Sequence, residues 1–104
     1  MIEQEIQTTI AENFNVNYTL LENESYKHNV PKDSESHFKL VLVTDDFIGQ
    51  RLVQRHQAIY RALETIMPKI HALALHLYTE SEWQAKNHTV LDSPNCLGGE
   101  KASH

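Results

Sequence analysis

The stretch from residue 70 to residue 83, IHALALHLYTESEW, restricts the possible folds more than any other part of the chain. Its large and small apolar residues alternate, so the leucines point to one face and the residues between them to the other, as in a β-strand. Thr79 and Glu82 form a capping box, which predicts a short helix carrying Trp83 directly after the strand. His71 stands at the head of the strand in phase with the leucines, where a histidine is either a satisfied core residue or a ligand.

Hydrophobic periodicity predicts the remaining elements. Isoleucines recurring every four residues predict an amphipathic helix over 1–14, and alternating apolar residues predict a strand over 16–22. Residues 38–44 are almost continuously aliphatic, as in a central strand that is covered on both faces. Apolar residues with helical spacing predict a long helix over 51–67, which Pro68 stops.

The predicted element order is therefore αββαβα, an α/β (α+β) fold with a three-stranded mixed sheet and helices packed on it. The second strand, long helix and third strand form a right-handed βαβ unit with parallel strands, and the first two strands are antiparallel. The loop over 23–36 enters the second strand at the edge where both parallel strands begin. We therefore expect three histidines, His28 in the loop, His37 and His71, to converge on this edge, with His56 farther away.

Composition narrows the class of protein. The length predicts one domain over 1–88, with 89–104 as a flexible C-terminal tail. A net charge of −5 argues against indiscriminate binding to nucleic acid or to an anionic membrane. Cys96 is the single cysteine, which excludes an intrachain disulfide and fits a reducing, cytoplasmic setting. No apolar run approaches the roughly 18 residues that a membrane span needs.

The histidines at the predicted edge suggest metal chemistry. Two neutral imidazoles can bind a transition metal or one iron of an iron–sulfur cluster. Two ligands are too few for a closed structural site, so a partner would have to supply the rest. The alternatives are that His71 is a buried structural residue and that His28 is a solvated loop residue. Cys96 lies in the tail, and no catalytic motif is present, so we do not expect an enzyme.

A second candidate site lies at the start of the long helix. Arg51, Arg55 and His56 gather there, and a helix N-terminus favours phosphate, so these residues are candidates for contact with nucleic acid. The alternative is a solvated helix face with Asp45 and Asp46 close by. The αββαβα order is similar to that of KH-type nucleic-acid domains, but the GxxG clamp of those domains is missing.

Several longer segments resemble one family. They are ESYKHNVP (24–31), SESHFKLVLV (34–43), the F-x-G of 47–49, QRHQAIY (54–60), IHALALHLYT (70–79) and EW (82–83). Together they span nearly the whole chain, and they resemble the BolA family, in particular its bacterial subgroup of morphogene and stress-response proteins. The resemblance implies a single KH-like domain, in agreement with the predicted order of elements.

The resemblance also implies partners and a cofactor. BolA-like proteins pair with monothiol CGFS glutaredoxins and can share a glutathione-supported [2Fe–2S] cluster, in iron–sulfur trafficking or iron sensing. In that arrangement the positions of His71 and His28 ligate the cluster, and the glutaredoxin and glutathione supply two thiolates. The predicted topology, rather than the resemblance, adds His37 as a possible further edge residue. The isolated protein is expected to carry no cluster and to be a monomer or a weak homodimer.

Bacterial BolA is also described as a DNA-binding transcriptional regulator that affects cell shape, division, motility and biofilm. This chain departs from the family there, because Gln57 stands where the family often has a second basic residue. A third hypothesis is an interaction domain whose edge histidines are structural and never bind metal.

Overall fold

The structure of the protein is a computed structural model that describes residues 1–25 and 35–89. Its elements follow the order α1 (Ile2–Asn13), β1 (Tyr18–Asn23), β2 (His37–Val43), the 3₁₀ turn η2 (Asp45–Phe47), α2 (Leu52–Ala62), the 3₁₀ turn η3 (Met67–Lys69), β3 (Ala72–Tyr78) and α3 (Glu80–Ala85). Apart from the two short 3₁₀ turns, this is the predicted order αββαβα. No helix in the described ranges is long and apolar enough to cross a membrane.

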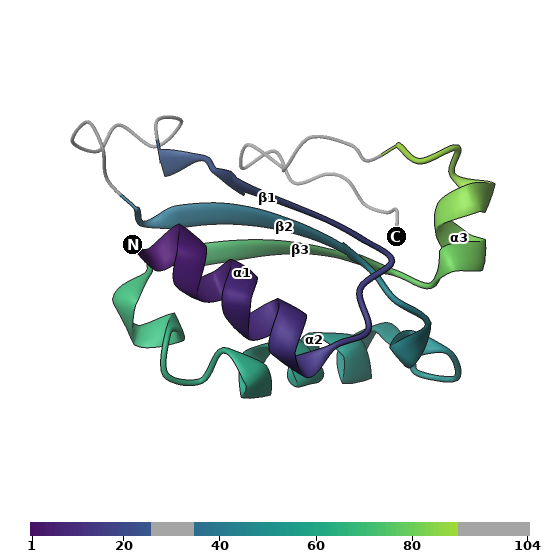
Figure 1. The fold of residues 1–104 in the computed structure, drawn as a ribbon, viewed down its shortest axis with the longest axis horizontal. Coiled ribbons are helices and arrows are strands. Elements are labelled where there is room, and N and C mark those ends of the chain that lie inside the picture. Colours follow the sequence, from purple (N-terminus) through teal and green to yellow (C-terminus); the bar gives the residue numbers. More distant parts are fainter. Residues whose placement is uncertain (26–34, 90–104) are drawn as a thin grey trace.

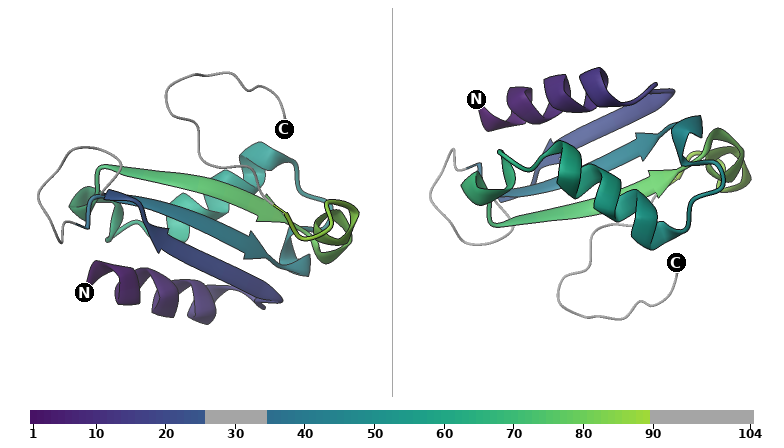
Figure 2. Two further views of the ribbon diagram at one scale, coloured as in Figure 1. Left: turned by 90° about the horizontal axis from the view of Figure 1, so that it is seen from above. Right: turned by 90° about the horizontal axis from the view of Figure 1, so that it is seen from below.

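The three strands form one mixed sheet in the order β1-β2-β3 (Figure 1). β1 and β2 are antiparallel, and β2 and β3 are parallel, with His37 opposite Ala72 and Val43 opposite Tyr78. The predicted mixed sheet is thereby confirmed. Helices α1 and α2 lie side by side across one face of the sheet, and α3 stands at the end of β3 (Figure 2).

The main core lies between the sheet and helices α1 and α2. Ile6 and Ile10 of α1 and Ile59 of α2 pack there against the alternate residues of β2 that face the helices, Phe38, Leu40 and Leu42. Each of these side chains is at most 2% exposed, and full burial of such a side chain contributes about 1.5–3 kcal/mol. The core therefore holds β2 at the centre of the sheet.

A smaller core lies on the other face of the sheet, where Val41 and Val43 pack with Trp83 of α3. β2 is thus buried on both faces, as its continuous aliphatic run predicts. Trp83 also contacts Tyr18 and Tyr78, with ring centroids 5.4 Å away in each case. These contacts fix α3 against the edge of the sheet where β2 and β3 end and β1 begins.

The long helix is shorter than predicted. It ends at Ala62 rather than near residue 67, and Leu63 caps it with its N–H bonded to the carbonyl of Ile59 at 2.9 Å. Leu63 and Ile66 are still buried, because the turns that follow place them on the core side. Pro68 lies in η3, beyond the end of α2, so the prediction that it stops the helix is wrong. The predicted tail over 89–104 lies, except for Thr89, outside the described residues.

Candidate functional site

His37 and His71 meet at the sheet edge where both parallel strands begin. His37 is the first residue of β2, and His71 immediately precedes β3. Their ring centroids are 5.0 Å apart, with 42° between the ring planes. The predicted meeting of these two histidines is confirmed. His28, the third residue expected there, lies outside the described residues, so its place stays a prediction.

The side chain of His71 is exposed, whereas the leucines of β3 that point to the same face of the sheet, Leu73, Leu75 and Leu77, are at least half-buried. The alternative that His71 is a buried core histidine is therefore wrong. Its exposure follows from its position, because His71 comes before the first paired residue of β3, beyond the end of the core. An exposed imidazole at an edge is accessible to a ligand or to a partner protein.

Backbone hydrogen bonds hold this edge in place. The N–H groups of His71 and Ala72 both donate to the carbonyl of Ser36, at 2.7 and 3.1 Å. The hydroxyl oxygen of Ser25 accepts from the N–H groups of Ser36 and His37, at 2.9 and 3.1 Å. Ser25 is only 3% exposed, so these bonds are shielded from water. Together they tie the end of β1 to the starts of β2 and β3.

A hydrogen bond also orients the ring of His37. Its Nδ1 lies 2.9 Å from the hydroxyl oxygen of Ser36, and the tautomer of His37 decides which of the two atoms is the donor. A partner of this kind on one ring nitrogen fixes the ring orientation, as it does for histidines that bind metals. The residue before this pair, Glu35, accepts from the N–H groups of Ile2 and Glu3 at 3.1 and 3.3 Å. Its carboxylate therefore caps α1, because the N-cap residue Met1 makes no side-chain cap hydrogen bond.

The donor set at this edge fits part of a metal or cluster site. Two imidazoles bound to one tetrahedral ion at about 2.0–2.1 Å have ring centres roughly 5 Å apart, which matches His37 and His71. Among residues 1–25 and 35–89, no group of three or more His, Cys, Asp or Glu side chains is arranged to hold a metal ion. The described edge therefore brings two imidazoles together, fewer than the four ligands of a closed tetrahedral site, so a metal bound here needs ligands from outside the described residues.

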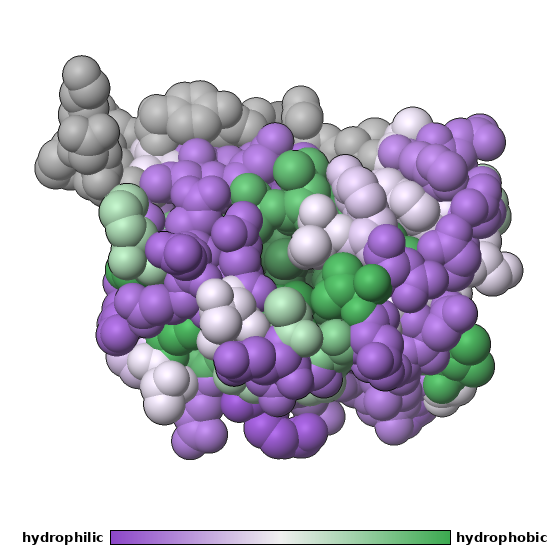
Figure 3. All heavy atoms as spheres, viewed as in Figure 1, coloured by the Kyte–Doolittle hydropathy of each residue, from purple (hydrophilic) through white to green (hydrophobic). Residues whose placement is uncertain are grey.

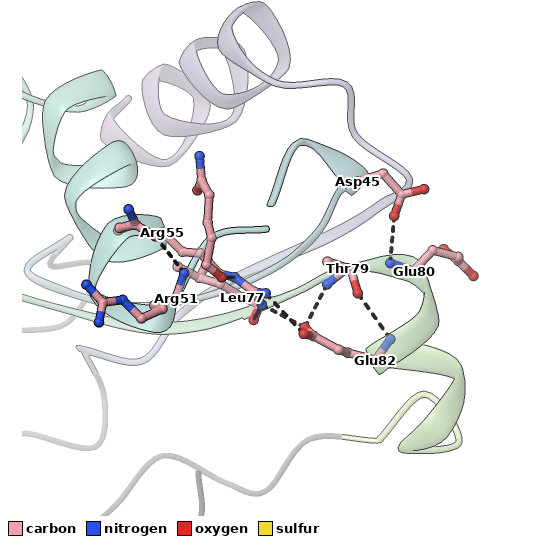
Figure 4. A network of polar contacts seen from close by, with 9 residues as sticks. Asp45, Arg51, Arg55, Leu77, Thr79, Glu80 and Glu82 are labelled. Carbon is pink, nitrogen blue, oxygen red and sulfur yellow. Dashed lines mark hydrogen bonds and ion pairs between the residues drawn. The ribbon is translucent and has the colours of Figure 1, made fainter. Parts of the chain in front are cut away.

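Arg55 differs from the sequence-based expectation. It is only 7% exposed, and its guanidinium makes a bidentate ion pair with Glu82, with N–O distances of 2.6 and 3.0 Å (Figure 4). It also donates to the backbone carbonyls of Gln50 and Leu77, at 3.0 and 3.3 Å. The expectation that Arg55 stands on an accessible helix face, ready to contact phosphate, is wrong. Its guanidinium instead joins α2 to β3 and α3.

The other two candidates for nucleic-acid contact lie near Arg55. Arg51 is the N-cap residue of α2 and is exposed, and its guanidinium points away from the Arg55–Glu82 pair in Figure 4. His56 is partly buried beside Tyr60, and this burial lowers the pKa of its imidazole below 6.5. A neutral His56 adds no positive charge near pH 7. Of the three residues, Arg51 alone offers an exposed charge.

Sequence reasoning missed three residues that shape these sites: Ser25, Glu35 and Glu82 as the partner of Arg55. One signal was available, because Arg55 precedes the buried Ile59 by four residues and so shares its helix face. The partners of Ser25 and Glu35 lie 11 to 33 residues away, at positions that only the folded chain brings together.

Comparison with known proteins gives consistent results. Residues 10–82 match the family of BolA-like proteins. The chain is 46% identical over 99 residues to the "DNA-binding transcriptional regulator BolA" of Escherichia coli, covering 94% of each chain. It is 49% identical over 98 residues to the Haemophilus influenzae protein of the same name, covering 93% of this chain and 95% of that one.

A similar solved structure is the solution structure of BolA1 from Mus musculus. It matches with a TM-score of 0.77 and 34% identity, over 93% of this chain and 79% of that one. The BolA domain of SufE1 from Arabidopsis thaliana matches with a TM-score of 0.71 and 32% identity, over 77% of this chain and 93% of that one.

Proposed function

Because this chain belongs to the BolA-like family, we propose that it is a non-enzymatic adaptor that binds a monothiol glutaredoxin and co-ligates a [2Fe–2S] cluster. One observation carries the proposal: His71 is an exposed imidazole at the edge where β2 and β3 begin, 5.0 Å from the ring of His37. Such an edge supplies nitrogen ligands and leaves room for a partner that supplies the others.

In this proposal the chain contributes two neutral imidazoles. His71 is the first ligand and His28 is the second, while the glutaredoxin and glutathione supply thiolates. A shared [2Fe–2S] cluster would provide an iron that accepts imidazole nitrogen, as in Rieske centres. The Ser25 and Ser36 hydrogen bonds keep the strand starts in position. Coordination requires neutral imidazoles, so cluster binding should weaken below about pH 6.

Visible-region circular dichroism tests the proposal. The protein is titrated anaerobically into cluster-loaded monothiol glutaredoxin, with wild type, His71→Ala and His28→Ala run in parallel. His88→Ala is a matched control, because His88 is exposed but stacks on Trp83 at the far end of β3. We expect a new spectrum with wild type and His88→Ala, and its loss when His71 or His28 is replaced.

Two results would count against this function. If the double variant His28→Ala, His71→Ala gives the wild-type spectrum, these histidines are not ligands. If wild type gives no spectral change and isothermal titration calorimetry detects no binding to the glutaredoxin, the partner is wrong as well. Calorimetry separates docking from ligation, because His71→Ala should retain binding to the cluster-free glutaredoxin.

A second candidate function is transcriptional regulation through DNA. Its support is the name that the bacterial relatives carry, together with the exposed Arg51 at the start of α2. Replacing Arg51 by Glu should abolish retention of promoter DNA in a gel shift, whereas Arg61→Glu, near the other end of the same helix, should change it little. An unchanged shift for Arg51→Glu would count against DNA binding by this helix. Arg55 is not a suitable test residue, because its loss would disturb the fold.

A further inference from the structure

A second concave surface lies at the opposite end of β3 from His71. It is a groove of about 570 Å³ between the start of α2, the end of β3 and the helix α3. Its apolar lining comes from Leu52, Leu77, Tyr78 and Ala85. The seven residues of β3 separate it from the histidine edge by about 20 Å, so the two surfaces can be occupied at the same time.

The floor of the groove is electrically balanced. Arg55 and Glu82 both line it, and they satisfy each other in the bidentate pair shown in Figure 4. The pair also supports Thr79, whose N–H donates to Glu82 at 2.9 Å. An apolar side chain can therefore enter the groove without leaving a charged group buried and unpaired.

Large apolar side chains extend this surface outward. Leu52 and Val53, in the first turn of α2, are 48% and 55% exposed, and Ile48, just before the helix, is 67% exposed. Figure 3 shows apolar atoms on the surface over the connection from β2 to α2. Isolated exposed apolar residues are ordinary, but Leu52 also lines the groove, and exposed apolar surface that continues into an apolar groove is typical of an interaction site.

The rim of the groove is positively charged. Arg51 lies on the α2 side and Lys86 on the α3 side, and both are exposed. Within residues 1–25 and 35–89, neither makes an ion pair with an acidic side chain, and the ammonium of Lys86 lies 5.4 Å from the ring centroid of Tyr78. The whole chain carries a net charge of −5, so this rim departs from the surrounding charge and favours an acidic ligand.

We propose that this groove docks an acidic, amphipathic peptide segment of a partner protein. Apolar side chains of the segment occupy the groove over Leu52 and Leu77, and its carboxylates pair with Arg51 and Lys86. DNA fits this surface less well, because Arg55 is engaged by Glu82, and the Glu82 carboxylate and the apolar side chains of the lining offer phosphate nothing to bind. The inference goes beyond the cluster function and does not depend on it, since His71 takes no part.

A labelled peptide and NMR test the inference. The probe is a fluorescein-labelled acidic helical peptide with Leu and Phe four residues apart, and its control replaces each Asp and Glu by Lys. We expect saturable binding of the acidic peptide, with amide shift changes at Leu52, Leu77 and Ala85 and none at His37. Leu52→Ser and Arg51→Glu should each weaken binding about tenfold, because each removes one of the two sources of affinity.

Arg61→Glu is the matched charge control, and His71→Ala shows whether the groove is independent of the cluster edge. Both should bind the peptide as wild type does. Several outcomes would overturn the inference: no saturable binding, equal binding of the Lys control, or shift changes confined to the histidine edge. Displacement of the peptide by duplex DNA, or by a second copy of the chain in a dilution series, would assign the groove to a different occupant.

Discussion

The Arg55–Glu82 ion pair makes the sharpest prediction about stability. Replacing Glu82 by Gln keeps the size of the side chain and one acceptor oxygen, but it removes the negative charge and one of the two oxygens that Arg55 contacts. Arg55 then remains 7% exposed, with two backbone carbonyls and the one remaining side-chain oxygen at position 82 as its acceptors. The substitution therefore tests what the ion pair contributes, with little change in packing.

The magnitude follows from hydrogen bonding and exposure. A hydrogen bond to a charged group contributes about 1.5–3 kcal/mol, and the substitution removes one such bond and weakens another. The side chain of Glu82 is 46% exposed, so solvent screens part of the interaction and the lower half of that range applies. We expect Glu82→Gln to lower the free energy of unfolding by about 2 kcal/mol at pH 7.

The cost of Glu82→Gln should depend on pH. The hydrogen bonds from Arg55, followed by the bonds from Thr79, hold the pKa of Glu82 below its usual value of 4.5. A carboxyl group whose pKa is lowered by folding stabilises the protein above its unfolded-state pKa, and this contribution is lost as the pH falls through the folded-state pKa. The difference between wild type and Glu82→Gln should therefore be constant from pH 6 to 7 and shrink below about pH 4.5.

Urea unfolding followed by tryptophan fluorescence measures this difference. Trp83 is the single tryptophan, is 7% exposed, and lies one residue after Glu82. Glu80→Gln is the matched control, because this carboxyl lies in the same helical turn and its side chain contacts Asn17 and Gln84 instead of Arg55. The reasoning is refuted if Glu82→Gln costs no more than Glu80→Gln at pH 7, or if its cost is the same at pH 3.5 and pH 7.

Three further predictions concern the histidine edge and the two helices. Ser25→Ala leaves the partly buried N–H groups of Ser36 and His37 without their acceptor, so it should cost about 1–3 kcal/mol in urea unfolding and speed hydrogen exchange at those two amides. Glu35→Ala removes the cap of α1 and should cost about 0.5–2 kcal/mol, whereas Glu35→Asp should restore part of the loss; equal stability of all three proteins would contradict the capping role. Burial lowers the pKa of His56, so an NMR titration should find its midpoint below 6.5, and its contribution to stability should fall as the pH drops below about 6.5; a midpoint at or above 6.5 would contradict this.

Periodicity was enough to predict the order of the helices and strands, although it placed the end of α2 too late. The alternating stretch at 72–78 is β3, and the Thr79–Glu82 capping box forms as predicted, with Glu82 N–H donating to the Thr79 hydroxyl at 3.2 Å. The parallel strands of a βαβ unit then placed the starts of β2 and β3 at one edge, which is why the meeting of His37 and His71 could be predicted. These inferences succeeded because each depends on local sequence or on a general rule of chain topology.

Arg55 shows where such reasoning ends. Seen in sequence, it is a cation four residues after Arg51 at a helix start, which is the pattern of a phosphate site. In the fold, the same side chain turns inward to Glu82, which lies 27 residues later and which the sequence had already assigned to a capping box. One carboxylate performs both roles, since its Oε1 accepts from Arg55 and from the Thr79 N–H. Patterns along a chain indicate that a residue is charged and on which helix face it lies, but not that a carboxylate from another element meets it.

The two ends of β3 therefore differ in what can bind them. At its start, backbone bonds to Ser36 hold His71 at an exposed edge, where its imidazole projects beyond the apolar core. At its end, the Arg55–Glu82 pair neutralises the charges of the site and leaves an apolar groove with a cationic rim. The burial of Arg55 thus removes a phosphate contact from α2 and at the same time makes the groove suitable for apolar side chains. It follows that Arg55→Met, which leaves the Glu82 carboxylate without its partner in the groove, should weaken binding of the acidic peptide as well as destabilise the fold.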